Sequence, residues 1–148
     1  MSFVSIRSLE KTYAGSPVFK DINFDIARGE FITLLGPSGC GKSTLLRCIA
    51  GLTPVDSGQI LLDGTDLVPM SPQKRGIGMV FQSYALFPNM TVAQNVAFGL
   101  RMQKVSAQDS QVRVDEALRM VELQDFAARY PHQLSGGQCQ RVALARSL

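Results

Sequence analysis

The chain has 148 residues, of which 45% are apolar, enough for one domain with a hydrophobic core that needs no disulfide or metal for stability. Its formal charge is only +3, from 15 basic and 12 acidic residues scattered along the sequence. This excludes a basic stripe for nucleic acid and a polybasic membrane anchor. The cysteines, Cys40, Cys48 and Cys139, form no CxxC pair, as expected for reduced thiols in a cytosolic protein. Arg7 precedes any apolar segment, so no secretory signal is expected.

The first predicted elements are strands. Ile22, Phe24 and Ile26 alternate with polar residues, which is the two-residue period of a strand with one solvent-exposed face. Residues 28–29 (Arg-Gly) then turn the chain, so we expect this strand in an antiparallel sheet. Residues 31–35 (FITLL) form a nearly continuous apolar run, which is typical of a strand covered on both faces in a central sheet.

A helix is predicted over residues 42–50, because a glycine and then a proline follow it closely. Two further strands are predicted at 59–62 and 77–81, and the turn signal Asp63-Gly64 closes the first of them. The succession of strand, glycine-rich loop and helix indicates an α/β fold.

The segment from residue 76 to residue 100 carries no charged side chain and is long enough to cross a bilayer. Gln82, Asn95 and other polar residues interrupt it, and Pro88-Asn89 marks a turn. This composition argues against a membrane-spanning helix.

The second half of the chain is predicted to be helical. Thr91 is placed to cap a helix that runs to about residue 103, and Ser106 to cap another that runs to about residue 121. Val114, Leu118 and Val121 form an apolar stripe on the second helix. There is no internal repeat or long linker, so the helices are expected to be an insertion into the same domain.

Residues 36–44 (GPSGCGKST) fit the pattern GxxxxGK[ST] between a predicted strand and a helix. Glycines let successive N–H groups point inward, and the helix amino terminus favours a polyphosphate. Lys42 is expected to reach the β- and γ-phosphates, and the Ser43 hydroxyl to join a Mg²⁺ shell. The alternative is an ordinary glycine-rich turn. The predicted nucleotide-binding residues of this loop are Gly36, Ser38, Gly39, Cys40, Gly41, Lys42, Ser43 and Thr44.

A second glycine motif, LSGGQ at residues 134–138, also precedes a predicted helix. It offers a serine hydroxyl and free N–H groups that suit an anion, although taken alone it is compatible with an ordinary capped helix. The predicted anion-binding residues here are Ser135, Gly136, Gly137 and Gln138.

Four motifs in this order resemble the ATP-binding subunits of ABC transporters. They are LEKTYAG with Tyr13, the loop at 36–44, Gln82 after the run IGMVF, and LSGGQ followed by QRVALAR within residues 134–146. The resemblance covers the whole chain. It implies a P-loop NTPase core of the ABC ATPase type with an antiparallel β subdomain and an α-helical subdomain, incomplete at the C-terminus. The implied boundaries are 1–86 for the core with the β subdomain, 87–137 for the helical subdomain and 138–148 for the start of the helix returning to the core.

The resemblance also implies ATP and Mg²⁺ as cofactors and gives roles to two further residues. Tyr13 would stack on adenine, where the alternative is a surface tyrosine at a strand end. Gln82 would reach Mg²⁺ and the attacking water, where the alternative is a polar residue that ends a strand. Lys42 and Gln82 are the implied catalytic residues, and Ser43 and Gln82 the implied metal ligands.

The implied partners are a second ATPase subunit and an integral-membrane permease, with a solute-binding protein acting indirectly and no nucleic acid. Two subunits would pair head to tail, so that Ser135, Gly137 and Gln138 close on the γ-phosphate held by the other. The permease would dock at Gln82–Met90, where the alternative is that the apolar residues are core. The implied location is cytoplasmic, peripheral on the cytoplasmic face of the inner membrane. The aromatic and apolar residues of the docking segment are Tyr84, Leu86, Phe87 and Met90.

Hydrolysis in the family also needs an aspartate followed by a glutamate after an apolar strand, and later a histidine. Residues 60–63 (ILLD) resemble that strand, but Gly64 stands where the glutamate belongs. His132 precedes LSGGQ, whereas the histidine of the family follows the acidic strand. We therefore expect a C-terminally truncated chain that binds ATP without hydrolysing it, and that is marginally stable and prone to aggregate.

The function predicted from the sequence is that of the ATPase subunit of a bacterial importer, which couples ATP binding and hydrolysis to solute transport. Two alternatives remain. A P-loop kinase would use the same phosphate loop but has no need of LSGGQ. A non-transport ABC ATPase of DNA repair or chromosome organisation would place long heptad repeats between the two motifs, and residues 44–134 contain none.

Overall fold

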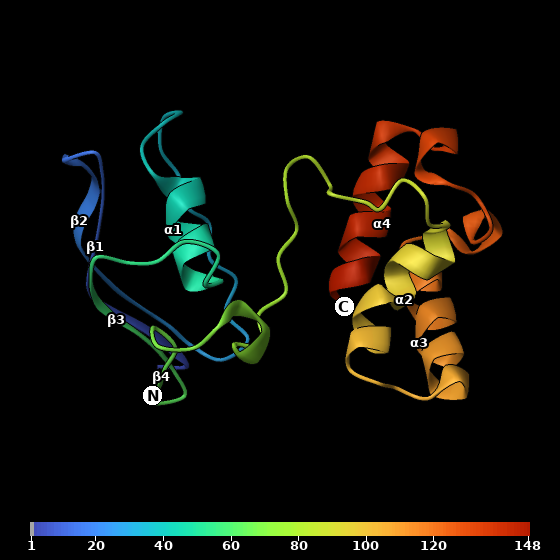
Figure 1. Ribbon diagram of the computed structural model, residues 1–148, viewed down its shortest axis with the longest axis horizontal. Helices are drawn as coiled ribbons and strands as arrows, with labels where there is room; N and C mark the ends of the chain where they lie inside the picture. Colours follow the sequence, from blue (N-terminus) through green and yellow to red (C-terminus); the bar gives the residue numbers. More distant parts are fainter. Residues whose placement is uncertain (1) are drawn as a thin grey trace. The chain divides into compact units, whose positions relative to one another are not determined.

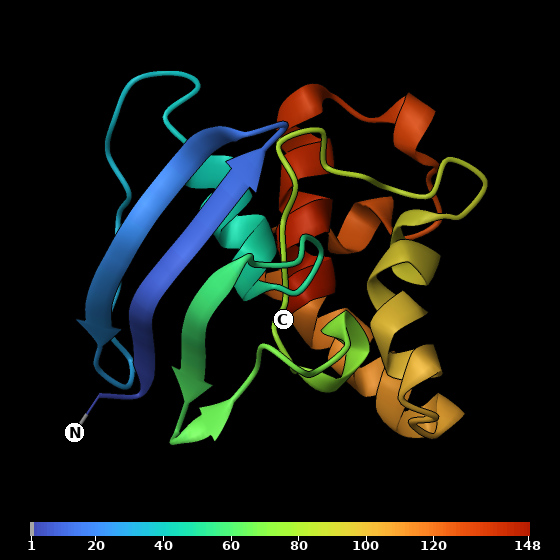
Figure 2. The same cartoon turned by 60° about the vertical axis from the view of Figure 1, so that its left-hand side comes forward.

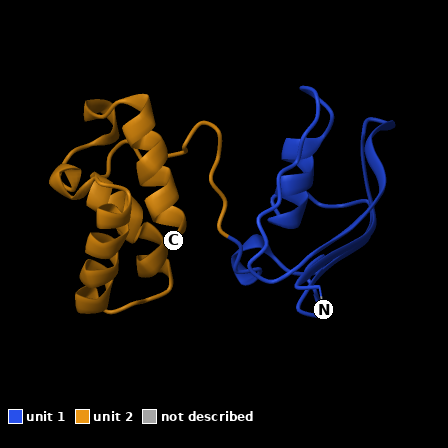
Figure 3. Cartoon of the chain, turned by 180° about the vertical axis from the view of Figure 1, so that it is seen from behind, with its two compact units in different colours: residues 1–77 blue, residues 78–148 orange. Residues whose placement is uncertain are grey.

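The computed structural model describes residues 2–148 (Figure 1). These residues fall into two compact units, 2–77 and 78–148 (Figure 3). The first unit contains β1 (Val4–Tyr13), β2 (Ser16–Ile26), α1 (Lys42–Ile49), β3 (Ser57–Leu62), β4 (Thr65–Asp66) and the 3₁₀ turn η1 (Pro72–Lys74). The second contains α2 (Val92–Met102), α3 (Ala107–Met120), η2 (Gln124–Phe126), η3 (Pro131–Gln133) and α4 (Gly136–Ser147).

The strands of the first unit form one antiparallel sheet in the order β2-β1-β3-β4, and Figure 2 shows them side by side. Ile22, Phe24 and Ile26 lie half-buried between exposed residues, so the predicted alternation and antiparallel pairing are confirmed. The core beneath the sheet includes Ile6 and Ile60, both fully buried. Partly buried and buried side chains from α1 and the following loops complete this core.

A bulge interrupts β1 where it faces β3. Ser8 has a left-handed φ of 42°, and the register between the two strands shifts between Arg7 and Glu10. Opposite the bulge, Gly58 has φ +93°, and a Cβ atom there would lie 2.4 Å from the Ser8 carbonyl oxygen. Only glycine fits this position, because a side chain would force the two strands apart.

The predicted strands at 31–35 and 77–81 were wrong for this structure. Neither segment joins a ladder among residues 2–148, and Phe31 and Leu35 are 91% and 89% exposed. An apolar run favours burial, but a strand also needs a neighbouring strand that accepts and donates its backbone hydrogen bonds. The antiparallel sheet supplies no such neighbour, so both segments run as irregular chain. Leu34 and Ile77 nevertheless pack against the core of the first unit.

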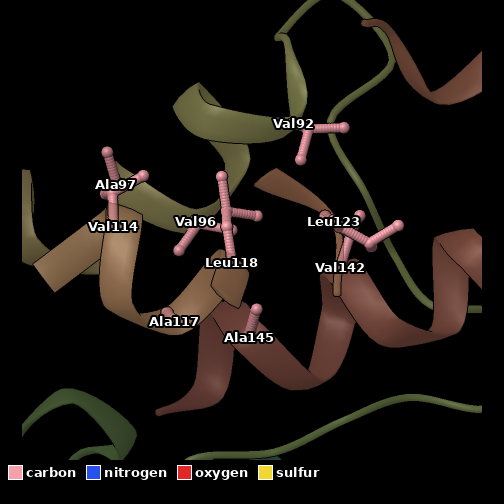
Figure 4. Close-up of a cluster of buried hydrophobic side chains, with 9 residues drawn as sticks. All are labelled: Val92, Val96, Ala97, Val114, Ala117, Leu118, Leu123, Val142 and Ala145. Atoms are coloured by element: carbon pink, nitrogen blue, oxygen red, sulfur yellow. The ribbon is translucent and has the colours of Figure 1, made fainter. Parts of the chain in front are cut away.

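The helices of the second unit pack around their own core, shown in Figure 4. Thr91 caps α2 in a capping box with Gln94, and Ser106 caps α3 by accepting a bond from the Asp109 N–H. Both predicted helices are therefore confirmed within a residue or two at each end. The core consists of Val92, Val96, Ala97, Val114, Ala117, Leu118, Leu123, Val142 and Ala145.

The uncharged segment from residue 76 to residue 100 contains loops and most of α2. Within residues 2–148, no helix combines the length and the apolar character that a bilayer crossing requires.

Candidate nucleotide-binding site

The glycine-rich loop of residues 36–41 leads directly into α1. Gly41 occupies the N-cap position of α1 with φ 92° and ψ 0°, and no side chain caps the amino terminus of this helix. A Cβ atom on Gly41 would lie 3.0 Å from Cγ1 of Val18 and 3.1 Å from the Val18 carbonyl oxygen. The close contact and the left-handed backbone both require glycine. The start of α1 is thereby held against β2.

The Lys42 ammonium group folds back over this loop. Its Nζ donates to the carbonyl oxygens of Gly36 and Pro37 at 2.8 and 2.6 Å, and lies 3.3 Å from Cys40 Sγ. The first N–H groups of a helix have no acceptor within the helix. A polyphosphate oxygen would replace the two carbonyls as the partner of the ammonium and accept from these N–H groups as well. The loop therefore fits a phosphate group, and the exposed Ser43 hydroxyl begins the same helix.

Tyr13 ends β1 close to this loop. Its backbone pairs with Ser16 at the start of β2, two residues before the Val18 that touches Gly41. Two residues of strand span roughly 7 Å. The hairpin therefore places the backbone of Tyr13, a residue that is 52% exposed, near the part of β2 that contacts Gly41.

Gln82 lies exposed in a turn of the second unit, in the first part of the loop that leads to α2. Two residues later the backbone takes a sparsely populated form, because Tyr84 and Ala85 both have left-handed φ values, 62° and 46°. Such conformations cost free energy and persist where other contacts hold them.

Arg146 of α4 supplies those contacts. Its guanidinium donates to the carbonyl oxygens of Ala85 and Tyr84 at 2.7 and 3.1 Å and lies 5.7 Å from the centre of the Phe87 ring. Burial lowers the pKa of Arg146, but a guanidinium stays charged throughout the physiological range. The helix that follows LSGGQ thus holds the loop that carries Gln82. Sequence reasoning missed this link, because about sixty residues separate its ends.

The LSGGQ segment forms the start of α4. The Ser135 hydroxyl accepts from the Gln138 N–H at 3.3 Å, and the Gln138 side chain accepts from the Ser135 N–H at 2.8 Å, so the two residues form a capping box. Gly136 and Gly137 are exposed, and added Cβ atoms there would meet nothing within 4 Å. The segment is accessible, but its own side chains already satisfy part of the helix terminus.

The segment predicted to dock a permease is tied to α2 by Asn95. This fully buried side chain accepts from the Phe87 N–H at 2.8 Å and donates to the carbonyl oxygens of Phe87 and Met90. Phe87 also packs on Phe98 with 4.5 Å between ring centres. Tyr84, Phe87 and Met90 are half-buried, so they belong partly to the packing of the unit and partly to its surface. The docking role stays a prediction.

Asp63 and His132, which the sequence does not favour as hydrolytic residues, both lie in turns. Asp63 lies in the β3–β4 turn and accepts from Arg28 at 3.0 Å. His132 is exposed in η3 and stacks on Tyr130 at 5.8 Å between ring centres. The turn predicted at Asp63-Gly64 is confirmed.

A sequence profile described as "ABC transporter" matches residues 19–148. The chain belongs to the ABC transporter family. It is 56% identical over 145 residues to the spermidine/putrescine import ATP-binding protein PotA of Haemophilus influenzae, and the match covers 98% of this chain and 39% of that protein. The corresponding protein of Escherichia coli K12 is 57% identical, with 98% and 38% covered. The chain thus spans about two fifths of the length of these relatives.

Two solved structures of the ATP-binding cassette MJ0796 share the fold with a TM-score of 0.89 and 36% identity, covering 98% of this chain and 68% of theirs. One is a dimer in a post-hydrolysis state bound to ADP and Pi, and the other is a dimeric bacterial ABC transporter cassette. The predicted family and α/β fold class are confirmed. The limits at 86 and 137 and the roles of the individual site residues stay predictions.

Proposed function

We propose that the protein is the ATP-binding subunit of an import system, in which ATP binding and hydrolysis drive a solute through a membrane permease. The family membership and the relatives named as import ATP-binding proteins support this function. The observation that carries it is the start of α1. There a left-handed Gly41 leaves the helix uncapped and the Lys42 ammonium lies on carbonyl groups that an anion would replace.

In this proposal the residues of the loop divide the work of holding Mg-ATP. The N–H groups of the loop and of the first helical turn bind the β-phosphate, and Lys42 neutralises charge at the β- and γ-phosphates. Mg²⁺, when bound, offsets the charge that develops on the phosphate oxygens, and Ser43 and Gln82 are the residues that would hold it. Tyr13 stacks on the adenine. Gln82 also orients the attacking water.

The proposed solute is a polyamine, because the relatives at 56–57% identity are named for spermidine and putrescine import. Solute selection would lie with the permease and a solute-binding protein, so this assignment concerns the system and not this chain's own pockets. We place the subunit at the cytoplasmic face of the inner membrane, with Gln82–Met90 against the permease.

The proposed assembly is a head-to-tail pair of subunits, supported by the dimeric state named for the similar cassettes. In such a pair Ser135, Gly137 and Gln138 of one subunit approach the γ-phosphate held by Lys42 of the other. Each nucleotide is then enclosed by two chains, which explains two anion-binding glycine motifs in one sequence.

Phosphate release under multiple-turnover conditions tests the enzymatic part of the proposal. The full-length protein should release phosphate, and Lys42→Ala should abolish the release, which also controls for contaminating ATPases. Residues 1–148 alone should bind ATP without turnover, because no aspartate–glutamate pair follows an apolar strand in this sequence. Turnover by residues 1–148 that matches the full-length protein and disappears in Lys42→Ala would contradict the expectation that these residues do not hydrolyse ATP. Transfer of the phosphoryl group to an acceptor other than water would contradict the proposal that the full-length protein is an ATPase.

A further inference from the structure

Asp56, immediately before β3, binds the terminal part of β1. Its carboxylate accepts from Lys11 Nζ at 2.7 Å, from the Thr12 N–H at 2.6 Å and from Thr12 Oγ1 at 2.7 Å. Its own N–H donates to the Glu10 carbonyl oxygen at 3.1 Å. One side chain therefore fixes two successive residues just ahead of Tyr13.

The contact replaces a missing part of the sheet. β3 begins at Ser57, which pairs with Glu10, so Thr12 and Tyr13 extend beyond the end of β3. A strand end without a neighbour on one side leaves its N–H groups to solvent and frays. The Asp56 carboxylate takes the Thr12 N–H that a longer β3 would have bound. It thereby holds the Thr12 backbone in place, one residue ahead of Tyr13.

The Lys11–Asp56 ion pair is shielded from solvent on the lysine side. The Lys11 side chain is only 8% exposed, whereas that of Asp56 is 39% exposed. The hydrogen bond from Lys11 and those from Thr12 lower the pKa of Asp56 to about 2, so its carboxylate is ionised at neutral pH. A buried ammonium needs such a partner, because an unpaired charge in an apolar site is costly.

The paired ammonium also faces the ring of Tyr13. Lys11 and Tyr13 are two residues apart on one strand, so their side chains share a face of the sheet. Lys11 Nζ lies 5.3 Å from the centre of the Tyr13 ring, within the range of a cation–aromatic contact. Because Tyr13 is still 52% exposed, the ion pair contacts it without covering it.

We propose that Lys11 and Asp56 are positioning residues for the nucleobase: together they fix the end of β1 and hold the Tyr13 ring in the orientation that stacks on adenine. This inference rests on the proposed ATP-binding function and extends it to the base. It predicts that the ion pair contributes to the part of the ATP affinity that comes from the base, and not to the part that comes from the phosphates.

A tryptophan reporter separates those two parts of the affinity. Residues 1–148 contain no tryptophan, so Tyr13→Trp adds a fluorophore at the proposed stacking position, and the full-length protein without this substitution gives the background emission. In the full-length protein carrying Tyr13→Trp, ATP should quench or shift this emission, whereas inorganic tripolyphosphate should bind without doing so. Titration with each ligand gives both affinities and the spectral signature of stacking.

Lys11→Met and Asp56→Asn are then placed in this background. Lys11→Met keeps the apolar stem and removes the charge, so it is the milder variant if Asp56→Asn folds poorly. Each variant should weaken ATP binding about fivefold and reduce the spectral change. A loss of this size is expected when the cation–aromatic contact is removed and the ring at position 13 is no longer held in one orientation. The affinity for tripolyphosphate should stay within about twofold, because the phosphate loop is not altered.

Asp25→Asn is the matched control. Asp25 forms an equally short ion pair, 2.7 Å to Arg7, between β1 and β2 at the opposite end of β1. It should leave the affinities for both ligands unchanged. Lys11→Met and Asp56→Asn overturn the inference if they leave ATP affinity unchanged, or if they weaken ATP and tripolyphosphate equally, which marks a purely structural role.

The proposed function fails in a different way. If the reporter protein binds neither ATP nor tripolyphosphate while remaining folded, the nucleotide site itself is wrong and the inference falls with it. If it binds ATP without any spectral change, ATP binding stands and the assignment of base stacking to position 13 is overturned.

Discussion

Two helices of this chain begin after glycine-rich segments, and they begin in opposite ways. α1 starts at a left-handed Gly41 with no side-chain cap, and its first lysine bonds the carbonyls of the preceding loop. α4 starts at Ser135, which forms a capping box with Gln138. One terminus is left with unsatisfied donors, whereas the other satisfies two of its donors internally.

The difference separates two kinds of anion site. An uncapped helix start with a lysine beside it can bind a phosphate without breaking a cap, because its free N–H groups gain an acceptor. A capped start gains less, since a phosphate must first compete with the cap. We therefore propose that α1 binds nucleotide within a single subunit, whereas α4 contributes only when a second subunit brings a phosphate to it.

The largest expected effect comes from the uncapped start. Lys42→Ala removes the ammonium that the loop holds in place, and ATP affinity should fall about a hundredfold, as expected for loss of strong charge-assisted bonds. Titration of each variant with a fluorescent ATP analogue measures this. Ser135→Ala should retain the wild-type affinity of the single subunit, and an equal loss in both variants would contradict the distinction between the two helices.

Alanine substitution of the glycines distinguishes the two starts by stability. Gly41→Ala meets Val18 at 3.0 Å and forces a left-handed φ on alanine, so it should lower the free energy of unfolding by about 2 kcal/mol and weaken ATP binding. Gly136→Ala meets nothing within 4 Å at the first position of a helix and should be neutral or stabilising by about 0.5 kcal/mol. Chemical denaturation measures both. Equal destabilisation by the two substitutions would show that the α1 start is not specially constrained.

The cap itself gives a smaller effect. Ser135→Ala should lower the free energy of unfolding by about 1 kcal/mol, and so should Thr91→Ala, because Thr91 forms the same capping box at the start of α2. Thr91→Ala is thus matched in stability but does not touch the LSGGQ motif. If only Ser135→Ala impairs ATP-dependent pairing of subunits, the effect belongs to the motif. Equal impairment by both would assign it to stability.

Thiol labelling gives the smallest effect and refines the position of the nucleotide. Cys40 is exposed in the glycine-rich loop, 3.3 Å from the Lys42 ammonium, whereas Cys48 is buried in α1. ATP should slow maleimide labelling of Cys40 several times more than that of Cys48, as followed by mass spectrometry of peptides. Labelling of Cys40 that ignores ATP would place the nucleotide elsewhere.

Local signals in the sequence predicted the local structure well. Thr91 and Ser106 begin helices because their hydroxyls accept bonds from residues three positions on, and the start of α1 follows from the glycine motif alone. The apolar run at 31–35 also gave a clear local signal, yet no strand formed. The difference is that a cap needs only its own helix, whereas a strand needs a distant partner.

The same distinction between local and distant contacts applies to the candidate site. The phosphate loop and LSGGQ were recognisable as contiguous motifs, but the residues that hold their neighbours were not. Asp56 reaches Thr12 across more than forty residues, and Arg146 reaches Ala85 across sixty-one. Arg146 ends the QRVALAR motif and Asp56 belongs to no motif, but neither contact could be predicted from the sequence, because each depends on which backbone groups the fold leaves without partners.

Complementation between two inactive variants tests the two-site arrangement most directly. Neither full-length Lys42→Ala nor full-length Ser135→Ala should form a dimer with ATP, since every head-to-tail pair made from one variant has two damaged sites. A mixed pair contains one intact site, with Lys42 from one chain and Ser135 from the other. Sedimentation velocity with ATP should therefore show a dimer of one copy of each chain only in the mixture. A mixture that stays monomeric, or a dimer formed by Ser135→Ala alone, would contradict the assignment of the two helix starts to one shared nucleotide.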